Sequence, residues 1–123
     1  AKIVAAQRRL VMRRGEVWWA NLSDPVGSEP GYRRPVLIVQ DNAFNQSQIS
    51  TVVVAAITSN VFLSGAPGNV RLTKKACGLN RESVVNVSQI ITLDKTSLTE
   101  KSGRISGKLQ QDVDQGLGLA LAL

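Results

Sequence analysis

Short runs of apolar and β-branched residues, separated by polar loops, make up most of this chain. Such runs, bounded by turn-forming residues, predict buried β-strands. The predicted strands cover residues 16–22, 35–40, 51–57, 69–73 and 83–93, with residues 100–105 as a sixth candidate. After Ser106, a residue type that caps helices, leucine or valine recurs every fourth residue from Leu109 to Leu121, which predicts a C-terminal helix with one apolar face.

Short strands, long loops and one terminal helix are typical of a small, strongly bent β-barrel that is closed by helices. The chain has 123 residues, 43% of them hydrophobic, which suits one globular domain with one core. Met12 stands just before the first predicted strand. We therefore expect a single domain over residues 12–123 and an N-terminal extension over residues 1–11.

The formal charge of +6 suits a polyanionic partner but does not establish one. Lys2, Arg8 and Arg9 lie in the first eleven residues, and the remainder has twelve basic and nine acidic residues, a net charge of +3. The chain has no histidine and one cysteine, Cys77. This composition excludes an internal disulfide and the usual zinc sites, so we expect no metal and no cofactor, and Cys77 is interpreted as structural.

Membrane insertion is not predicted, because no apolar stretch approaches the roughly 20 residues that a spanning helix needs. The first eleven residues also lack the pattern of a secretory signal. We expect a cytoplasmic protein.

Residues 27–40, GSEPGYRRPVLIVQ, join a polar turn to a buried strand. Arg34 precedes Pro35, so its backbone is restricted to extended conformations. Its guanidinium is thereby held at the mouth of the strand, beside a loop with Ser28 and Glu29, an arrangement that suits phosphate binding. On composition alone, a solvated charge flanking a strand is the commoner explanation.

Two further features have more than one interpretation. Thr58, Ser59 and Asn60 place two hydroxyls and an amide at a strand end, which is either a polar turn or part of a site. Trp18 and Trp19 must point to opposite faces of their strand. One should pack in the core, and the other is a rim residue, a subunit contact or a platform for base stacking; packing is the favoured interpretation.

Taken together, four blocks of sequence resemble the MazF/PemK family, the toxins of bacterial toxin–antitoxin pairs. The blocks are MRRGEVWWANLSDPVGSEPGYRRPVLIVQ, VVVAAITS, GLNRESVVNVSQIITLDKTSLTEKSGRIS and VDQGLGLAL. The match runs over residues 12–123, and the order and spacing of the blocks make it specific. A match to the RRPVLIV block alone would not be specific.

The resemblance implies an SH3-like small barrel of the MazF/PemK/CcdB type with a C-terminal helix. It also implies a homodimeric endoribonuclease, or mRNA interferase, that cuts single-stranded RNA at short motifs. A cognate antitoxin with an acidic, partly disordered tail would neutralise it. The family's catalytic positions fall on Arg34 and Thr58. The residues expected to bind or orient RNA are Ser28, Glu29, Ser59, Gln89 and Asn45.

These positions make chemical sense, because RNA carries its own nucleophile, the 2′-hydroxyl, and a metal is then not required. Arg34 can stabilise the charge that grows on the phosphate, and Thr58, assisted by Ser59, can donate to a phosphate oxygen. Arginine stays protonated and is a poor general base, so Glu29 is offered either as the base or as an orienter of Arg34.

The sequence departs from some relatives at Ser88, Ile91 and Asn69, where they carry an acidic residue, an arginine and a histidine. The cleavage motif can therefore not be carried over from them. The alternative function is a non-enzymatic toxin of the same fold that binds DNA gyrase, and an inactive binder is a third reading. The apolar end of the chain, LALAL, together with the RRP and ITS blocks, favours the nuclease.

Overall fold

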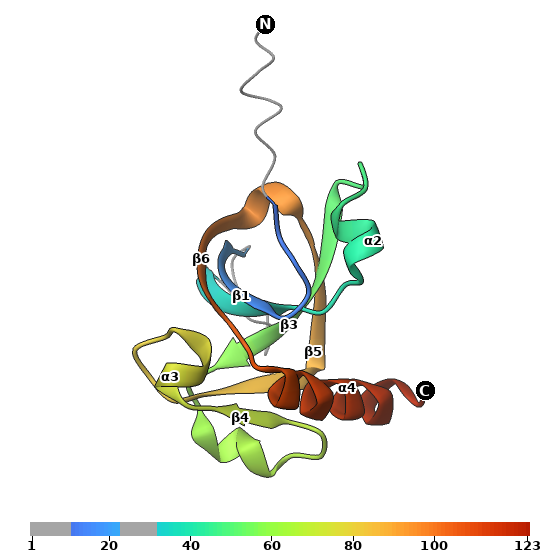
Figure 1. Cartoon of the computed structure of the whole chain (residues 1–123). Helices are drawn as coiled ribbons and strands as arrows, with labels where there is room; N and C mark the ends of the chain where they lie inside the picture. The colour runs from blue at the N-terminus through green and yellow to red at the C-terminus, as the bar shows by residue number, and fades with distance from the viewer. Residues whose placement is uncertain (1–10, 23–31) are drawn as a thin grey trace, which may run out of the picture.

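In the computed structural model, which describes residues 11–22 and 32–123, the strands form one strongly curled antiparallel sheet (Figure 1). The strands are β1 (Glu16–Asn21), β2 (Arg33–Ile38), β3 (Thr51–Thr58), β4 (Val70–Leu72), β5 (Ser83–Asp94) and β6 (Leu98–Arg104). Their order across the sheet is β4-β5-β3-β2-β1-β6. The predicted mainly-β fold is confirmed, as a curled half-barrel in which, within these residues, the edge strands β4 and β6 are not paired with each other.

Helical segments lie in the connections and at the end of the chain. They are α2 (Asn42–Asn45), the 3-10 turns η1 (Val61–Gly65) and η2 (Lys95–Ser97), α3 (Lys74–Cys77) and the long helix α4 (Gly107–Leu121). The sequence predicts that Asp41 or Asn42 caps one helical turn, and Asp41 caps α2, because its carboxylate accepts from the Ala43 amide at 2.8 Å. The sequence also predicts Asp94 as the cap of a short helical turn over residues 95–98, but its side chain makes no capping bond to η2, so this prediction is wrong. No helix among the described residues is long and apolar enough to cross a membrane.

A register shift gives the sheet its curl. Along the β3–β5 pair, Ala55 lies opposite Ile90 but the next residue, Ala56, lies opposite Asn86. Such bulges bend the longer strand and increase its twist. β5 therefore pairs with β4 and β3 in its first half and with β3 alone in its second half.

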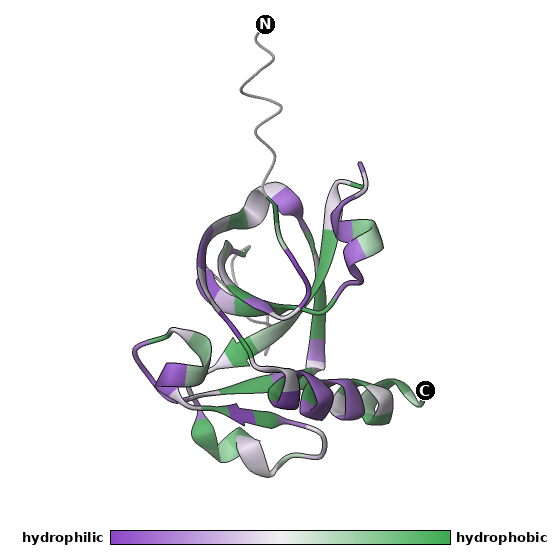
Figure 2. Ribbon diagram, in the orientation of Figure 1, coloured by the Kyte–Doolittle hydropathy of each residue, from purple (hydrophilic) through white to green (hydrophobic). Residues whose placement is uncertain are grey.

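The alternating residues of the central strands build two separate cores. Val17 and Leu37 face the core beneath α4, and Trp18 and Val36 face the core inside the curl. Figure 2 shows hydrophobic colour along β3 and hydrophilic colour on the face of α4 that is turned to the viewer. The prediction that one tryptophan packs in the core is confirmed for Trp18, which is buried.

Helix α4 begins at its predicted cap, where Ser106 Oγ accepts from the Leu109 amide at 3.2 Å. Of the predicted apolar stripe, Val113 and Leu117 are buried and Leu109 is half-buried. Leu121 is 53% exposed, so the stripe continues beyond the part of the helix that packs on the sheet.

Two glycines allow a loop to approach α4 closely. Gly116 lies against the backbone of Gly68, and a Cβ at position 116 would overlap the Gly68 carbonyl oxygen. Gly68 itself has φ +80°, a conformation that other residues rarely adopt. The sequence indicates only that Gly116 weakens the helix, whereas the structure shows that the space of a side chain is occupied by the loop before β4.

Cys77 ends α3 and is fully buried, and its Sγ donates to the Thr73 carbonyl oxygen at 3.3 Å. Burial raises the pKa of the thiol above its ordinary value. The structural interpretation of this cysteine therefore agrees with its surroundings.

A buried carboxylate fixes the start of β1. Glu16 is only 3% exposed. Its Oε1 accepts from Trp18 Nε1 and from the Arg13 amide, both at 2.9 Å, and its Oε2 accepts from Lys101 Nζ at 3.2 Å. Burial by itself would raise the pKa of Glu16, but these three donors together outweigh it and hold the pKa below the ordinary value.

We expect Glu16 to make the fold acid-sensitive. Because its folded pKa lies below its unfolded pKa of about 4.3, ionised Glu16 stabilises the fold above that pH, and this contribution is lost as pH falls through the folded pKa. Urea unfolding from about pH 6 to about pH 3 should show Glu16→Gln less stable than wild type at the high end. The difference should shrink toward the low end, and a difference that does not change with pH would contradict this account.

Candidate active site

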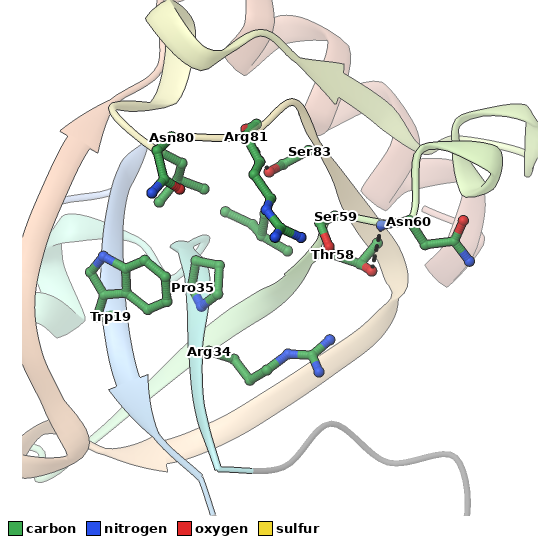
Figure 3. A pocket seen from close by; sticks show the side chains of 11 residues that line it. Trp19, Arg34, Pro35, Thr58, Ser59, Asn60, Asn80, Arg81 and Ser83 are labelled. Carbon is green, nitrogen blue, oxygen red and sulfur yellow. Dashed lines mark hydrogen bonds between the residues drawn. The ribbon is translucent and has the colours of Figure 1, made fainter.

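A pocket of about 470 Å³ opens at the start of β2, beside the end of β3 and the loop before β5 (Figure 3). It is lined by Trp19, Arg34, Pro35, Ile57, Thr58, Ser59, Asn60, Leu79, Asn80, Arg81 and Ser83. Its volume lies within the range of roughly 300–1,000 Å³ that is usual for ligand sites. Three predicted site residues, Arg34, Thr58 and Ser59, therefore line one pocket.

The strand register explains why Arg34 and Thr58 meet, although 23 residues separate them in the sequence. In the β2–β3 pair, Val36 lies opposite Ala56. Continuing this antiparallel register by two residues places Arg34 level with Thr58. Side chains two residues apart point to the same face of a strand, so the pairing of an apolar ladder delivers two polar side chains to one edge.

The two neighbouring arginines of β2 have different surroundings. Arg33 donates to Glu100 at 3.0 Å, and its guanidinium lies 4.6 Å from the centre of the Trp19 ring. Arg34 is half-buried, and no carboxylate of residues 11–22 or 32–123 lies within ion-pair distance of it. Arg33 thus anchors Trp19 at the rim of the pocket, and Arg34 faces the pocket (Figure 3).

Thr58 is oriented by the turn that follows it. Its Oγ1 accepts from the Asn60 amide at 3.1 Å, the bond that is dashed in Figure 3. A hydroxyl that accepts in this way keeps its own proton for donation to a ligand. Asn60 accepts from the Phe62 amide at 3.2 Å and so caps η1, which means that this triplet is both a turn and a wall of the pocket.

The remaining predicted residues lie elsewhere. Asn45 is buried in α2, where its Nδ2 donates to the Gln40 carbonyl oxygen at 2.9 Å. Gln89 lies at the bend of β5 and accepts from Asn86 Nδ2 at 3.2 Å. Neither residue lines the pocket. Ser28 and Glu29 fall outside the described residues, and the RNA contacts proposed for all four stay predictions.

Sequence reasoning did not single out Asn80, Arg81 and Ser83, which form the wall opposite β2. From the sequence alone, residues 74–81 indicate only a basic turn. The signal was nevertheless present, because Arg81 stands just before a buried strand, the same context that drew attention to Arg34.

This architecture matches a known protein family. Residues 13–121 match the PemK-like, MazF-like toxins of type II toxin–antitoxin systems. The chain belongs to this family.

Curated MazF relatives cover nearly the whole chain. Endoribonuclease MazF6 of Mycobacterium tuberculosis is 46% identical over 114 residues, which cover 93% of this chain and 100% of the relative. Endoribonuclease EndoA of Bacillus subtilis is 39% identical over 114 residues, which cover 93% of this chain and 97% of the relative.

Solved MazF structures share the fold. MazF of Deinococcus radiodurans has a TM-score of 0.75 at 25% identity, covering 93% of this chain and 99% of that one. A mycobacterial endoribonuclease in complex with its cognate antitoxin has a TM-score of 0.69 at 26% identity, covering 92% and 95%. The resemblance to the MazF/PemK family and the fold that it implies are confirmed.

Proposed function

We propose that this MazF-like chain is an endoribonuclease that cleaves single-stranded RNA through attack by the RNA's own 2′-hydroxyl. The observation that carries the proposal is that Arg34 and Thr58 line one pocket, with no carboxylate of the described residues paired to Arg34. The endoribonuclease names of the relatives agree with it.

The reaction forms a bond from the 2′-oxygen to phosphorus and breaks the bond from phosphorus to the 5′-oxygen. Negative charge grows on the non-bridging phosphate oxygens as this happens. Arg34 would offer two parallel N–H donors to these oxygens, and the Thr58 hydroxyl would donate a hydrogen bond to one of them. One oriented donor of this kind is typically worth a factor of about 10²–10³ in rate.

These two donors and the 2′-hydroxyl satisfy the electrostatic and nucleophilic needs of the reaction, so we propose that no metal is required. Arg34 remains protonated and is a poor base. We assign Glu29 either as the base for the 2′-hydroxyl or as an orienter of Arg34. Ser59 would assist Thr58.

The expected result is cleavage of a long single-stranded RNA in excess EDTA. The products should end in 2′,3′-cyclic phosphate (or 3′-phosphate) and 5′-hydroxyl, because the 2′-oxygen displaces the 5′-oxygen. Mass spectrometry of the fragment ends measures this, and the fragment boundaries give the sequence motif. RNA that stays intact across several unrelated sequences would contradict the proposal and direct the next test to gyrase binding.

We also propose that the protein is a homodimer. An apolar groove of about 560 Å³ lies between α2 and the end of α4, with exposed Phe44, Leu121 and Leu123 along it. A second copy of the chain would cover these side chains. Sedimentation at the concentration of the cleavage assay should give the mass of two chains, and the mass of one would contradict this.

A cognate antitoxin with an acidic tail is the second partner that we propose. Solved MazF relatives include complexes with their antitoxins. The cationic pocket at Arg34 would attract an acidic peptide as it attracts RNA. Addition of the antitoxin to the EDTA assay should abolish cleavage, and full activity in its presence would argue against competition at this site.

A further inference from the structure

A second guanidinium enters the pocket from the side opposite β2. Arg81 belongs to the loop between α3 and β5, and its side chain reaches toward the Thr58–Ser59 end of β3 (Figure 3). The loop is anchored on both sides of Arg81, by buried Leu79 and by Ser83, whose hydroxyl donates to the Arg81 carbonyl oxygen at 3.1 Å. The base of this side chain is therefore fixed.

The carboxylates near the pocket are engaged elsewhere. Glu82, next to Arg81 in the chain, pairs with Arg71, and the hydrogen bond from that guanidinium holds the pKa of Glu82 below its ordinary value. Glu100 pairs with Arg33. Within the part of the chain that the structure describes, no carboxylate forms an ion pair with Arg81.

Arg34 and Arg81 thus bring two positive charges to one pocket. Arg34 is half-buried and Arg81 is exposed, and anionic groups that bind between or beside them are attracted by both charges. A single phosphate would be held by Arg34 and Thr58. The guanidinium of Arg81, on the opposite wall, would then bind a second anionic group.

Successive phosphates of an RNA strand supply such a pair of anions. We propose that Arg81 binds the phosphate next to the one that is cleaved, an inference that rests on the proposed function. One nucleotide would then lie in the pocket of about 470 Å³ that both arginines line. Trp19 and Asn80 then line the space in which its base would lie, and aromatic and amide groups of this kind contact unstacked bases.

The test is RNA binding by Arg81→Ala, measured with an oligonucleotide that carries a 2′-deoxy residue at the cleavage position and so cannot be cut. A charge-assisted bond is lost, so Kd should rise roughly tenfold to a hundredfold. The slope of log Kd against log salt should fall by about 0.7, the value for one phosphate contact on a single strand. Arg81→Lys keeps the positive charge but not the two parallel donors of a guanidinium. It should therefore have the wild-type salt slope but only part of the wild-type affinity.

A chemical change in the ligand identifies the phosphate. Two oligonucleotides are made, each with one neutral methylphosphonate in place of the phosphate that directly precedes or directly follows the scissile phosphate. With one of the two, the Kd of wild type should rise by the same factor as it does on substitution of Arg81, and the Kd of Arg81→Ala should not rise further. Arg104→Ala, an exposed arginine of β6 that does not line the pocket, is the matched control and should keep the wild-type Kd.

The outcomes separate this inference from the proposed function. An unchanged Kd and salt slope in Arg81→Ala would overturn the inference while wild-type cleavage of normal RNA leaves the function intact. A changed sequence preference at an unchanged slope would also overturn it, because Arg81 would then contact a base. The full set of expected Kd changes, observed with a protein that does not cleave RNA, would support the phosphate contact and refute the nuclease.

Discussion

Arg34→Ala should lower the single-turnover rate of RNA cleavage at least roughly 10²–10³-fold, because it removes the oriented guanidinium that stabilises the transition-state charge. The stability of the fold should stay almost unchanged. No described carboxylate pairs with Arg34, so the substitution leaves no buried charge behind, and the free energy of unfolding should change by less than about 0.5 kcal/mol. Cleavage kinetics and urea unfolding of the same preparation measure both quantities.

Arg33→Ala is the matched control, because it removes the same side chain one residue earlier in β2. Its loss breaks the contacts with Glu100 and Trp19, which costs stability of about 0.5–1 kcal/mol, but it should leave the rate within a few fold of wild type. Equal rate losses in the two variants, or normal cleavage by Arg34→Ala, would contradict the assignment of Arg34.

Two glycine-to-alanine substitutions within α4 should change stability in opposite directions. A Cβ at position 116 would overlap the Gly68 backbone, and it would also press on Val87. Gly116→Ala should therefore destabilise the fold by about 1–3 kcal/mol or more, since the loop before β4 has to move. At Gly118 a Cβ meets only the Leu123 carbonyl oxygen, at 3.8 Å, so Gly118→Ala should gain about 0.5–1 kcal/mol from better helix propensity.

Thermal or urea unfolding of Gly116→Ala, Gly118→Ala and wild type measures these changes in stability. Intrinsic helix propensity favours alanine at both positions, so any loss at position 116 reports the contact with Gly68. If both variants were stabilised by similar amounts, the close approach of the loop to α4 would be refuted.

The framework of this site was accessible from the sequence because it depends on local patterns. The continuous apolar run after Pro35 and the run that ends at Thr58 set both strands, and antiparallel pairing then brings their polar ends together. The cap at Ser106 and the buried Val113 followed from helical spacing in the same way.

What the sequence could not provide depends on contacts between distant segments. The bulge opposite Ala56 has no local signature, yet it bends β5 and decides where Gln89 lies. Arg81 looks like one of several surface cations until the fold carries its loop across to Thr58. The requirement for a glycine at position 116 likewise comes from a loop almost fifty residues earlier in the chain.

The rate at which a thiol reagent labels the lone cysteine would measure local opening of the structure around it. Thiol reagents attack the exposed thiolate, and Cys77 is both buried and held in the thiol form by its raised pKa. Labelling must therefore wait until α3 lifts from β6, whose Gly103 lies against the Cys77 carbonyl. The labelling rate in native buffer thus reports how often the segment before the Arg81 loop detaches, without any denaturant.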